Sequence, residues 1–196
     1  MKKAKLIRLS YSLLAAVLVM TFLCCETKDP VKEADQHNDA KFSSAEEAKN
    51  NSHFLVDAAG LLLQDIELAK LAQNNSIKKD VRKTGQRLEF EYTQAYSKLK
   101  QVASKKTITL PAEVSSSDKK TDSDISYEIS DKFDDKYFEL SKKDHEEAIS
   151  LLGKIKDKCS HADIREWAGN TLTLYRNNAD SLLTLEKKLA LNKPNP

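Results

Sequence analysis

Residues 133–152 read FDDKYFELSKKDHEEAISLL, and this stretch has the clearest helical period in the chain. Side chains three and four positions apart are mostly apolar, which is typical of a helix that buries one face. These positions are Phe133, Tyr137, Leu140, Asp144, Ala148 and Leu151. Asp144 is the exception, because a carboxylate on an apolar face is costly to bury without a partner. The neighbouring His145 is a candidate partner or metal ligand, so this stretch carries the first candidate site.

The composition of the 196-residue chain indicates an all-α protein. Only four Gly and four Pro are present, while 32% of the residues are charged and 7% are aromatic. A β-sandwich would need turn residues about every ten positions, so this scarcity favours helices. The length fits one domain with a tail.

Residues 1–25 have the layout of a secretory signal. Four basic residues precede the apolar run SLLAAVLVMTFLCC, which is shorter than the roughly 20 residues of a membrane-spanning helix. The cysteine pair is similar to the junction of a bacterial lipoprotein, in which the cysteine after the cleavage point is lipidated. We expect lipidation at Cys25, because Cys24 is the smaller residue to place before the cleavage point, and Cys24 is the second choice. An ordinary cleaved signal and an uncleaved anchor are the alternatives.

The charge of the mature chain argues against nucleic-acid binding. Removing residues 1–25 would take away four basic residues and leave 28 basic and 30 acidic ones. Such a chain has no basic excess with which to neutralise phosphates. Cys159 would be the remaining thiol, so no disulfide framework is expected.

The rest of the chain divides into a polar segment, a long helical region and a short tail. Residues 26–43 are polar and charged, and we expect a flexible tether there. Residues 44–192 form the predicted helical domain, and residues 193–196 form the tail. Ser44 and Glu47 fit a capping box at the start of the domain.

Four long amphipathic helices are predicted within the domain, with a long connection between the second and the third. The first helix runs to about residue 73, and the second spans about 77–103. The third follows a cap at Ser130 and ends near 158. The fourth starts with the capping pattern Ser160–Asp163 and ends before 192. Residues 105–124 are long enough to travel along the molecule. This order predicts a ferritin-like antiparallel four-helix bundle. A coiled-coil rod is the alternative, disfavoured because three breaks interrupt the heptads.

Each predicted helix carries one polar residue on its apolar face. These residues are Asp65, Tyr92, Asp144 and Asn178. Metal sites in bundles commonly have a Glu three residues before a His, but Lys142 occupies that position before His145. We therefore expect a structural layer, in which Tyr92 and Asn178 satisfy the two aspartates and His145 by hydrogen bonds. The alternative is a metal site built from Asp65, Glu91, Asp144 and His145.

The chain from Phe54 to Leu189 resembles the bacterial family called domain of unknown function 4142, which comprises ferritin-like envelope proteins. The residues that carry the resemblance are FDDKYFELSKKDH at 133–145, AAGLLLQDIELAKLA at 58–72, TITLP at 107–111 and WAGNTL at 167–172. The chain departs from the family pattern at several positions. Glu91 and Tyr92 replace the usual Asp-His of the second helix, and Asn178 replaces the usual His of the fourth. If relatives bind metal there, the resemblance implies that this member has lost the site.

These observations favour a non-enzymatic envelope protein without a cofactor. We expect it at the outer membrane or the periplasmic face, attached through a lipid and acting by contact with another envelope protein or in envelope stress. The competing hypothesis is a metal-binding or oxidase-like bundle that uses the inward Asp, Glu and His residues.

Overall fold

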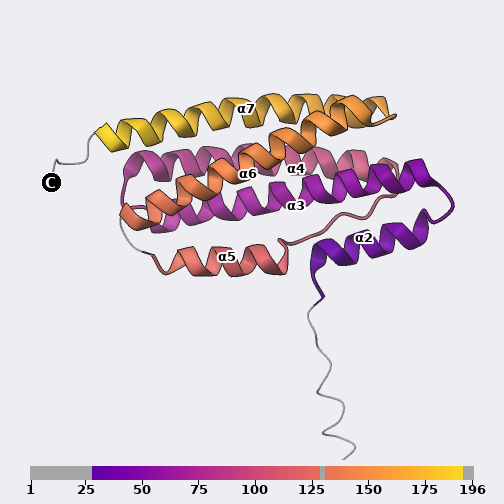
Figure 1. Cartoon of the computed structure of the whole chain (residues 1–196), viewed down its shortest axis with the longest axis horizontal. Helices are drawn as coiled ribbons and strands as arrows, with labels where there is room; N and C mark the ends of the chain where they lie inside the picture. Colours follow the sequence, from indigo (N-terminus) through magenta and orange to yellow (C-terminus); the bar gives the residue numbers. More distant parts are fainter. Residues whose placement is uncertain (1–27, 129–130, 192–196) are drawn as a thin grey trace, which may run out of the picture.

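The computed structural model describes residues 28–128 and 131–191, which form six helices and no strand. The helices are α2 (Pro30–Lys41), α3 (Glu46–Asn75), α4 (Lys79–Lys105), α5 (Ser116–Ser126), α6 (Asp131–Lys158) and α7 (Ala162–Leu191). The all-α class predicted from composition is therefore confirmed (Figure 1). None of the described helices is long and apolar enough to cross a membrane. The predicted signal, with Cys24 and Cys25, lies outside the described residues.

The four long helices α3, α4, α6 and α7 pack side by side around one apolar core (Figure 1). Hairpin connections make α3 antiparallel to α4, and α6 antiparallel to α7. The Cys159 thiol near the end of α6 contacts Asn51 near the start of α3, so these two helices are also antiparallel. At one end of the α4–α7 pair Lys106 meets Asp163, and at the other end Lys188 meets Asp80. Each long helix thus runs opposite to both of its neighbours.

The close packing of α3 against α4 depends on Gly85. A Cβ atom at this position would lie 2.6 Å from the carbonyl oxygen of Ala69, which is shorter than van der Waals contact. The missing side chain therefore lets the two backbones approach. Aromatic rings fill the centre of the core, where Tyr92, Tyr137 and Tyr175 are at most 1% exposed.

Residues 106–130 connect α4 to α6, and because these helices are parallel the connection must travel along the molecule. The Tyr96 hydroxyl donates to the carbonyl of Pro111 at 2.6 Å, which fixes the first half of the connection. The second half forms α5, which packs on α3 and α6 with Ile125 as its one fully buried residue. The predicted long crossover is present, and residues 116–126 of it form an 11-residue helix.

The expectation of a flexible tether over residues 26–43 is wrong for residues 30–41, which form α2. The Asp29 carboxylate accepts hydrogen bonds from the backbone N–H groups of Val31 and Lys32, and Pro30 occupies the first turn. Both features favour helix initiation. The Asn38 side chain is fully buried and exchanges two hydrogen bonds with the backbone of Thr109, at 2.8 and 2.9 Å.

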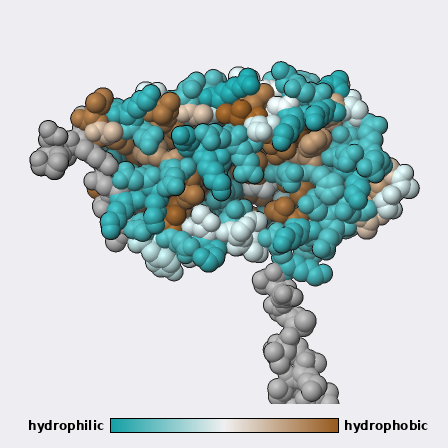
Figure 2. All heavy atoms as spheres, in the orientation of Figure 1, coloured by the Kyte–Doolittle hydropathy of each residue, from teal (hydrophilic) through white to brown (hydrophobic). Residues whose placement is uncertain are grey.

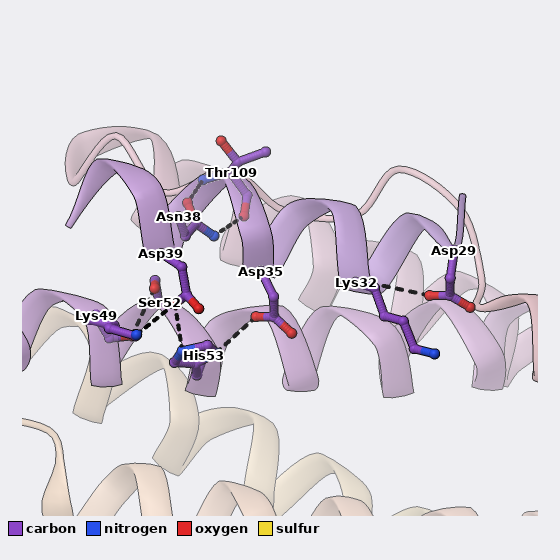
Figure 3. A network of polar contacts seen from close by, with 9 residues as sticks. All are labelled: Asp29, Lys32, Asp35, Asn38, Asp39, Lys49, Ser52, His53 and Thr109. Atoms are coloured by element: carbon purple, nitrogen blue, oxygen red, sulfur yellow. Dashed lines mark hydrogen bonds and ion pairs between the residues drawn. The ribbon is translucent and has the colours of Figure 1, made fainter. Parts of the chain in front are cut away.

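His53 on α3 contacts two aspartates of α2 and so holds α2 against α3 (Figure 3). Its Nδ1 atom lies 3.0 Å from Asp35 Oδ1, and its Nε2 atom lies 2.9 Å from Asp39 Oδ1. Lys49 also approaches Asp39, at 3.4 Å. Polar contacts therefore hold α2 in place. Such contacts produce no apolar periodicity, so the sequence pattern did not predict this helix.

The predicted capping box at Ser44 is wrong, because helix α3 begins at Glu46 after Ala45 without a side-chain cap. Helix α7 begins at Ala162, within the predicted pattern Ser160–Asp163. The Ser160 hydroxyl instead donates to the Glu47 carboxylate across the end of the molecule. These two polar side chains therefore satisfy each other and not the helix ends. The predicted cap at Ser130 lies outside the described residues.

The visible surface in Figure 2 is mostly hydrophilic, with apolar residues scattered among charged ones. Among the described residues, the exposed large apolar side chains are Ile77, Phe90, Tyr127, Leu183 and Leu191.

Candidate functional site

The four long helices each bring a polar residue into the interior. Asp65 comes from α3, Tyr92 from α4, His145 and Asp144 from α6, and Asn178 from α7. All five are at most 9% exposed. Only some of them meet, and Asp144 is not hydrogen-bonded to any of the other four.

Tyr92 and His145 form the centre of the site. The Tyr92 hydroxyl lies 2.7 Å from His145 Nε2, and His145 Nδ1 lies 2.7 Å from the carbonyl oxygen of Ser141. A carbonyl oxygen only accepts, so Nδ1 must carry the proton. In a neutral ring Nε2 then accepts from the Tyr92 hydroxyl. Burial lowers the pKa of His145 to about 4, which keeps the ring neutral at pH 7.

Asn178 extends this network toward the surface. Its Nδ2 group donates to Glu91 Oε2 at 2.9 Å and to the Tyr92 hydroxyl at 3.4 Å. Its Oδ1 atom accepts from Arg87 at 2.7 Å, and Arg87 also holds both carboxylate oxygens of Glu91. Each of these side chains therefore has a partner of the correct donor or acceptor type, in a chain of bonds that runs from the partly exposed Arg87–Glu91 pair inward to the Ser141 carbonyl. We call Arg87, Glu91, Tyr92, His145 and Asn178 the tyrosine–histidine network.

Tyr175, and not Tyr92 or Asn178, is the hydrogen-bond partner of Asp65. Its hydroxyl donates to Asp65 Oδ2 at 2.6 Å, and its ring stacks on Tyr92 with centroids 5.0 Å apart. Burial raises the pKa of Asp65 well above its usual value, and the bond from Tyr175 partly offsets this. The prediction that Tyr92 or Asn178 would satisfy Asp65 is therefore wrong. The tyrosine on the apolar face of the predicted fourth helix was the signal that could have found the pair.

Asp144 faces a different neighbourhood, beside α5. Its Oδ2 atom is buried and has no hydrogen-bond partner among the described residues, and the same is true of Gln64 Oε1 on α3. The Gln64 amide donates to Asp122 of α5 at 3.2 Å. Burial raises the pKa of both Asp144 and Asp122 to about 6. The charges of Glu67, Asp118 and Asp144 add to the shift of Asp122. We call Gln64, Asp122 and Asp144 the carboxylate cluster.

The geometry does not fit the metal site considered as the alternative. Both His145 nitrogens are already used, Glu91 is paired with Arg87, and Asp65 accepts from Tyr175. A metal ligand must offer a free lone pair, so His145 could bind an ion only after Tyr92 swings away. The described part of the chain holds no group of three or more His, Cys, Asp or Glu residues that could hold a metal ion.

Cys159 at the end of α6 is 3% exposed, and its thiol lies 3.1 Å from Asn51 Oδ1. Burial raises the pKa of this thiol, which disfavours the reactive thiolate. Its environment is that of a packed structural residue.

The comparisons with known proteins give a family and no described activity. The family model named "Domain of unknown function (DUF4142)" matches residues 36–184, which include all five residues of the tyrosine–histidine network. No match was found among curated proteins, and none among solved structures. Because the match covers most of the chain, this protein belongs to the DUF4142 family.

Proposed function

We propose that the protein is an exported, ferritin-like four-helix bundle held at the cell envelope by a lipid on Cys25, and that it acts through protein contacts or in envelope stress without catalysis. The signal-like residues 1–25 and the cysteine pair support export and anchoring. The alternating directions of α3, α4, α6 and α7, with the long connection before α6, support the bundle assignment.

The observation that carries the non-catalytic part is the closed tyrosine–histidine network. A general base needs a lone pair within reach of a substrate proton, and a metal ligand needs a lone pair within reach of an ion. His145 offers neither, because Nε2 accepts from Tyr92 and Nδ1 donates to Ser141. The ring is also 2% exposed. The network therefore supports a role in fixing the relative positions of α4, α6 and α7.

The docking of α2 changes how the anchor would work. Four residues, 26–29, lie between Cys25 and Pro30, the first residue of α2, so the five steps from one Cα atom to the next span at most roughly 17 Å. Because His53 and Thr109 hold α2 against the body, the lipid would keep the folded domain close to the membrane surface. A partner in the same membrane would then meet the domain at short range.

The anchor is tested by labelling the full chain with palmitate in a bacterial host that processes lipoproteins. We expect a labelled band that requires Cys25, is lost in Cys25→Ala, and accumulates as an unprocessed precursor when lipoprotein signal peptidase is inhibited. Cys159→Ala is the matched control, because this buried thiol should not affect labelling. Unchanged labelling in Cys25→Ala would contradict the assignment.

The non-catalytic part is tested against the metal hypothesis by elemental analysis of protein purified without chelator, before and after loading with iron, zinc or manganese. We expect no stoichiometric metal and the same melting temperature with or without chelator. One or two tightly bound ions per chain that disappear in His145→Ala would overturn this part of the proposal.

A further inference from the structure

Helices α4 and α7 leave an open groove of about 810 Å³ between them. Helices α2 and α5 pack chiefly on α3 and α6, so they leave this side uncovered, and Figure 1 shows α7 opposite α2 and α5. Phe90 lines the groove on α4 and is 64% exposed, and Leu174 lines it on α7. An exposed phenylalanine beside a groove is a feature of surfaces that bind other proteins.

The two walls of the groove carry opposite charges. Lys98 and Lys105 stand on the α4 wall, and Asp163 and Glu166 stand on the α7 wall. Glu91 also lies on the α4 wall, but Arg87 neutralises it. Lys106 likewise pairs with Asp163, so Glu166 supplies the acidic charge that the α7 wall offers to another molecule. Within the described part of the chain, neither of the two wall lysines nor Glu166 makes an ion pair.

The register between the helices places these features at matching heights. Trp167 of α7 donates its indole N–H to the carbonyl of Ala95 on α4 at 3.2 Å, and Lys106 pairs with Asp163 at 3.1 Å. Lys98 and Lys105 therefore lie at about the heights of Glu166 and Asp163. Further along the two helices, Arg87 of α4 donates to Asn178 of α7, which continues the same register. Phe90 therefore lies near the height of Leu174.

We infer that this groove is the interface of a homodimer, in which a two-fold axis parallel to the helices places α4 of each copy over α7 of the other. This rotation keeps the height of every residue and exchanges the two walls. Lys98 of each copy then faces Glu166 of the other, and Phe90 of each copy faces Leu174 of the other. Every contact occurs twice, as a two-fold interface requires.

The charges also favour this arrangement over the other face-to-face arrangement. A two-fold axis perpendicular to the helices would place α4 over α4 and α7 over α7. The wall lysines of α4 would then face α4 of the other copy instead of Glu166, so the opposite charges would not meet across the interface. Electrostatic complementarity therefore selects the axis along the helices, and its contribution should weaken as salt is added.

The dimer is tested by sedimentation equilibrium of the full chain in density-matched mild detergent. We expect a dimer whose dissociation constant rises with ionic strength. Lys98→Glu with Lys105→Glu makes both walls acidic and should raise the dissociation constant at least about tenfold. Glu166→Lys with Asn170→Lys makes the α7 wall basic and should weaken self-association in the same way.

Mixing the two variants is the decisive measurement. Each acidic wall then meets a basic wall at both halves of the interface, so a heterodimer should form with at least tenfold tighter association than either variant shows alone. Lys154→Glu with Lys158→Glu on α6 is the matched control, because it makes the same change in net charge at exposed positions outside the groove.

A wild-type chain that stays monomeric at every soluble concentration would overturn the inference. So would a dimer that is unaffected by the groove variants, or one that the α6 control weakens equally. Phe90→Ser gives an independent reading if a charge variant fails to fold, and it should also raise the dissociation constant. The lipid anchor plays no part in these outcomes, so they are separate from the test of the proposed function.

Discussion

The tyrosine–histidine network and the carboxylate cluster are both polar regions of the same helical interior, but they satisfy their buried groups differently. In the network, Tyr92 donates to a neutral His145, which donates to the Ser141 carbonyl. In the cluster, Asp144 Oδ2 and Gln64 Oε1 are buried without hydrogen-bond partners among the described residues. Burial lowers the pKa of His145 to about 4 and raises that of Asp144 to about 6. The comparison teaches that a buried base and a buried acid respond to pH with opposite signs.

The largest effect is expected at Tyr175, which belongs to neither region but packs against the network. Tyr175→Ala removes a fully buried ring stacked on Tyr92 and leaves Asp65 without its donor. We expect a loss of about 4 kcal/mol in the free energy of unfolding, measured by denaturant titration, against about 2 kcal/mol for Tyr175→Phe. Tyr127→Ala is the control, because that ring is 80% exposed. Equal losses in the Tyr175→Ala and Tyr127→Ala variants would contradict the packing described here.

The network should lose stability in acid. The pKa of His145 is about 4 in the folded protein and near 6.5 in the unfolded chain, so its neutral form contributes stability that is present above pH 6.5 and lost as the pH falls through 4. The difference in unfolding free energy between wild type and His145→Gln should therefore shrink by about 3 kcal/mol from pH 7.5 to pH 4. His37→Gln, at an exposed position of α2, is the matched control. A constant difference for the His145 variant would show that this ring is not buried in its neutral form.

The carboxylate cluster should behave in the opposite way. The folded pKa of Asp144 is raised to about 6 from a usual value of 3.8, so the contribution of this carboxyl group to stability is greatest below pH 4 and falls as the pH rises through 6. Asp144→Asn removes this cost and should stabilise the protein by roughly 1 to 2 kcal/mol at pH 7.5, allowing for solvent screening, with little change at pH 4. The exposed Asp180→Asn should be neutral at both values. Destabilisation by Asp144→Asn at pH 7.5 would reveal a donor to this carboxylate.

The smallest effect is expected at the contacts between His53 and the aspartates of α2, which unlike both interior regions are partly exposed. His53→Gln removes the ring that contacts Asp35 and Asp39. Global stability should change by less than about 1 kcal/mol, but amide exchange in residues 30–41 should become faster while α4 and α7 stay protected. Unchanged exchange in α2 would mean that the Asn38–Thr109 bonds hold the helix by themselves.

The parts of the fold that could be predicted are those driven by apolar periodicity. The stretch at 133–152 lies within α6, and the all-α class is confirmed. Helix α2 could not be predicted from apolar periodicity, because one of its two buried residues is the polar Asn38. The packing of α2 also depends on His53 of α3, which lies 15 positions after Asn38. Helix α5 was hidden for a similar reason, since Ile125 is its one fully buried residue.

The candidate site was predictable in its members but not in its pairings. Asp65, Tyr92 and Asn178 are buried as polar exceptions on apolar faces. A helical period gives the face of each residue but not its height relative to a facing helix, so the sequence could not decide that Tyr175 would reach Asp65. The separation of Asp144 from His145 follows from their one-residue offset, which turns Asp144 toward α5 and His145 toward Tyr92.

The central claim, that His145 is closed to protons and metals, is tested most directly by nitrogen NMR of its imidazole ring in the folded protein. At neutral pH we predict a proton on Nδ1 that exchanges slowly with solvent, an unprotonated Nε2, and no change in either signal when Zn²⁺ or Fe²⁺ is added. A proton on Nε2, or a metal-induced shift of Nε2, would contradict the claim and make the interior of this protein a binding site.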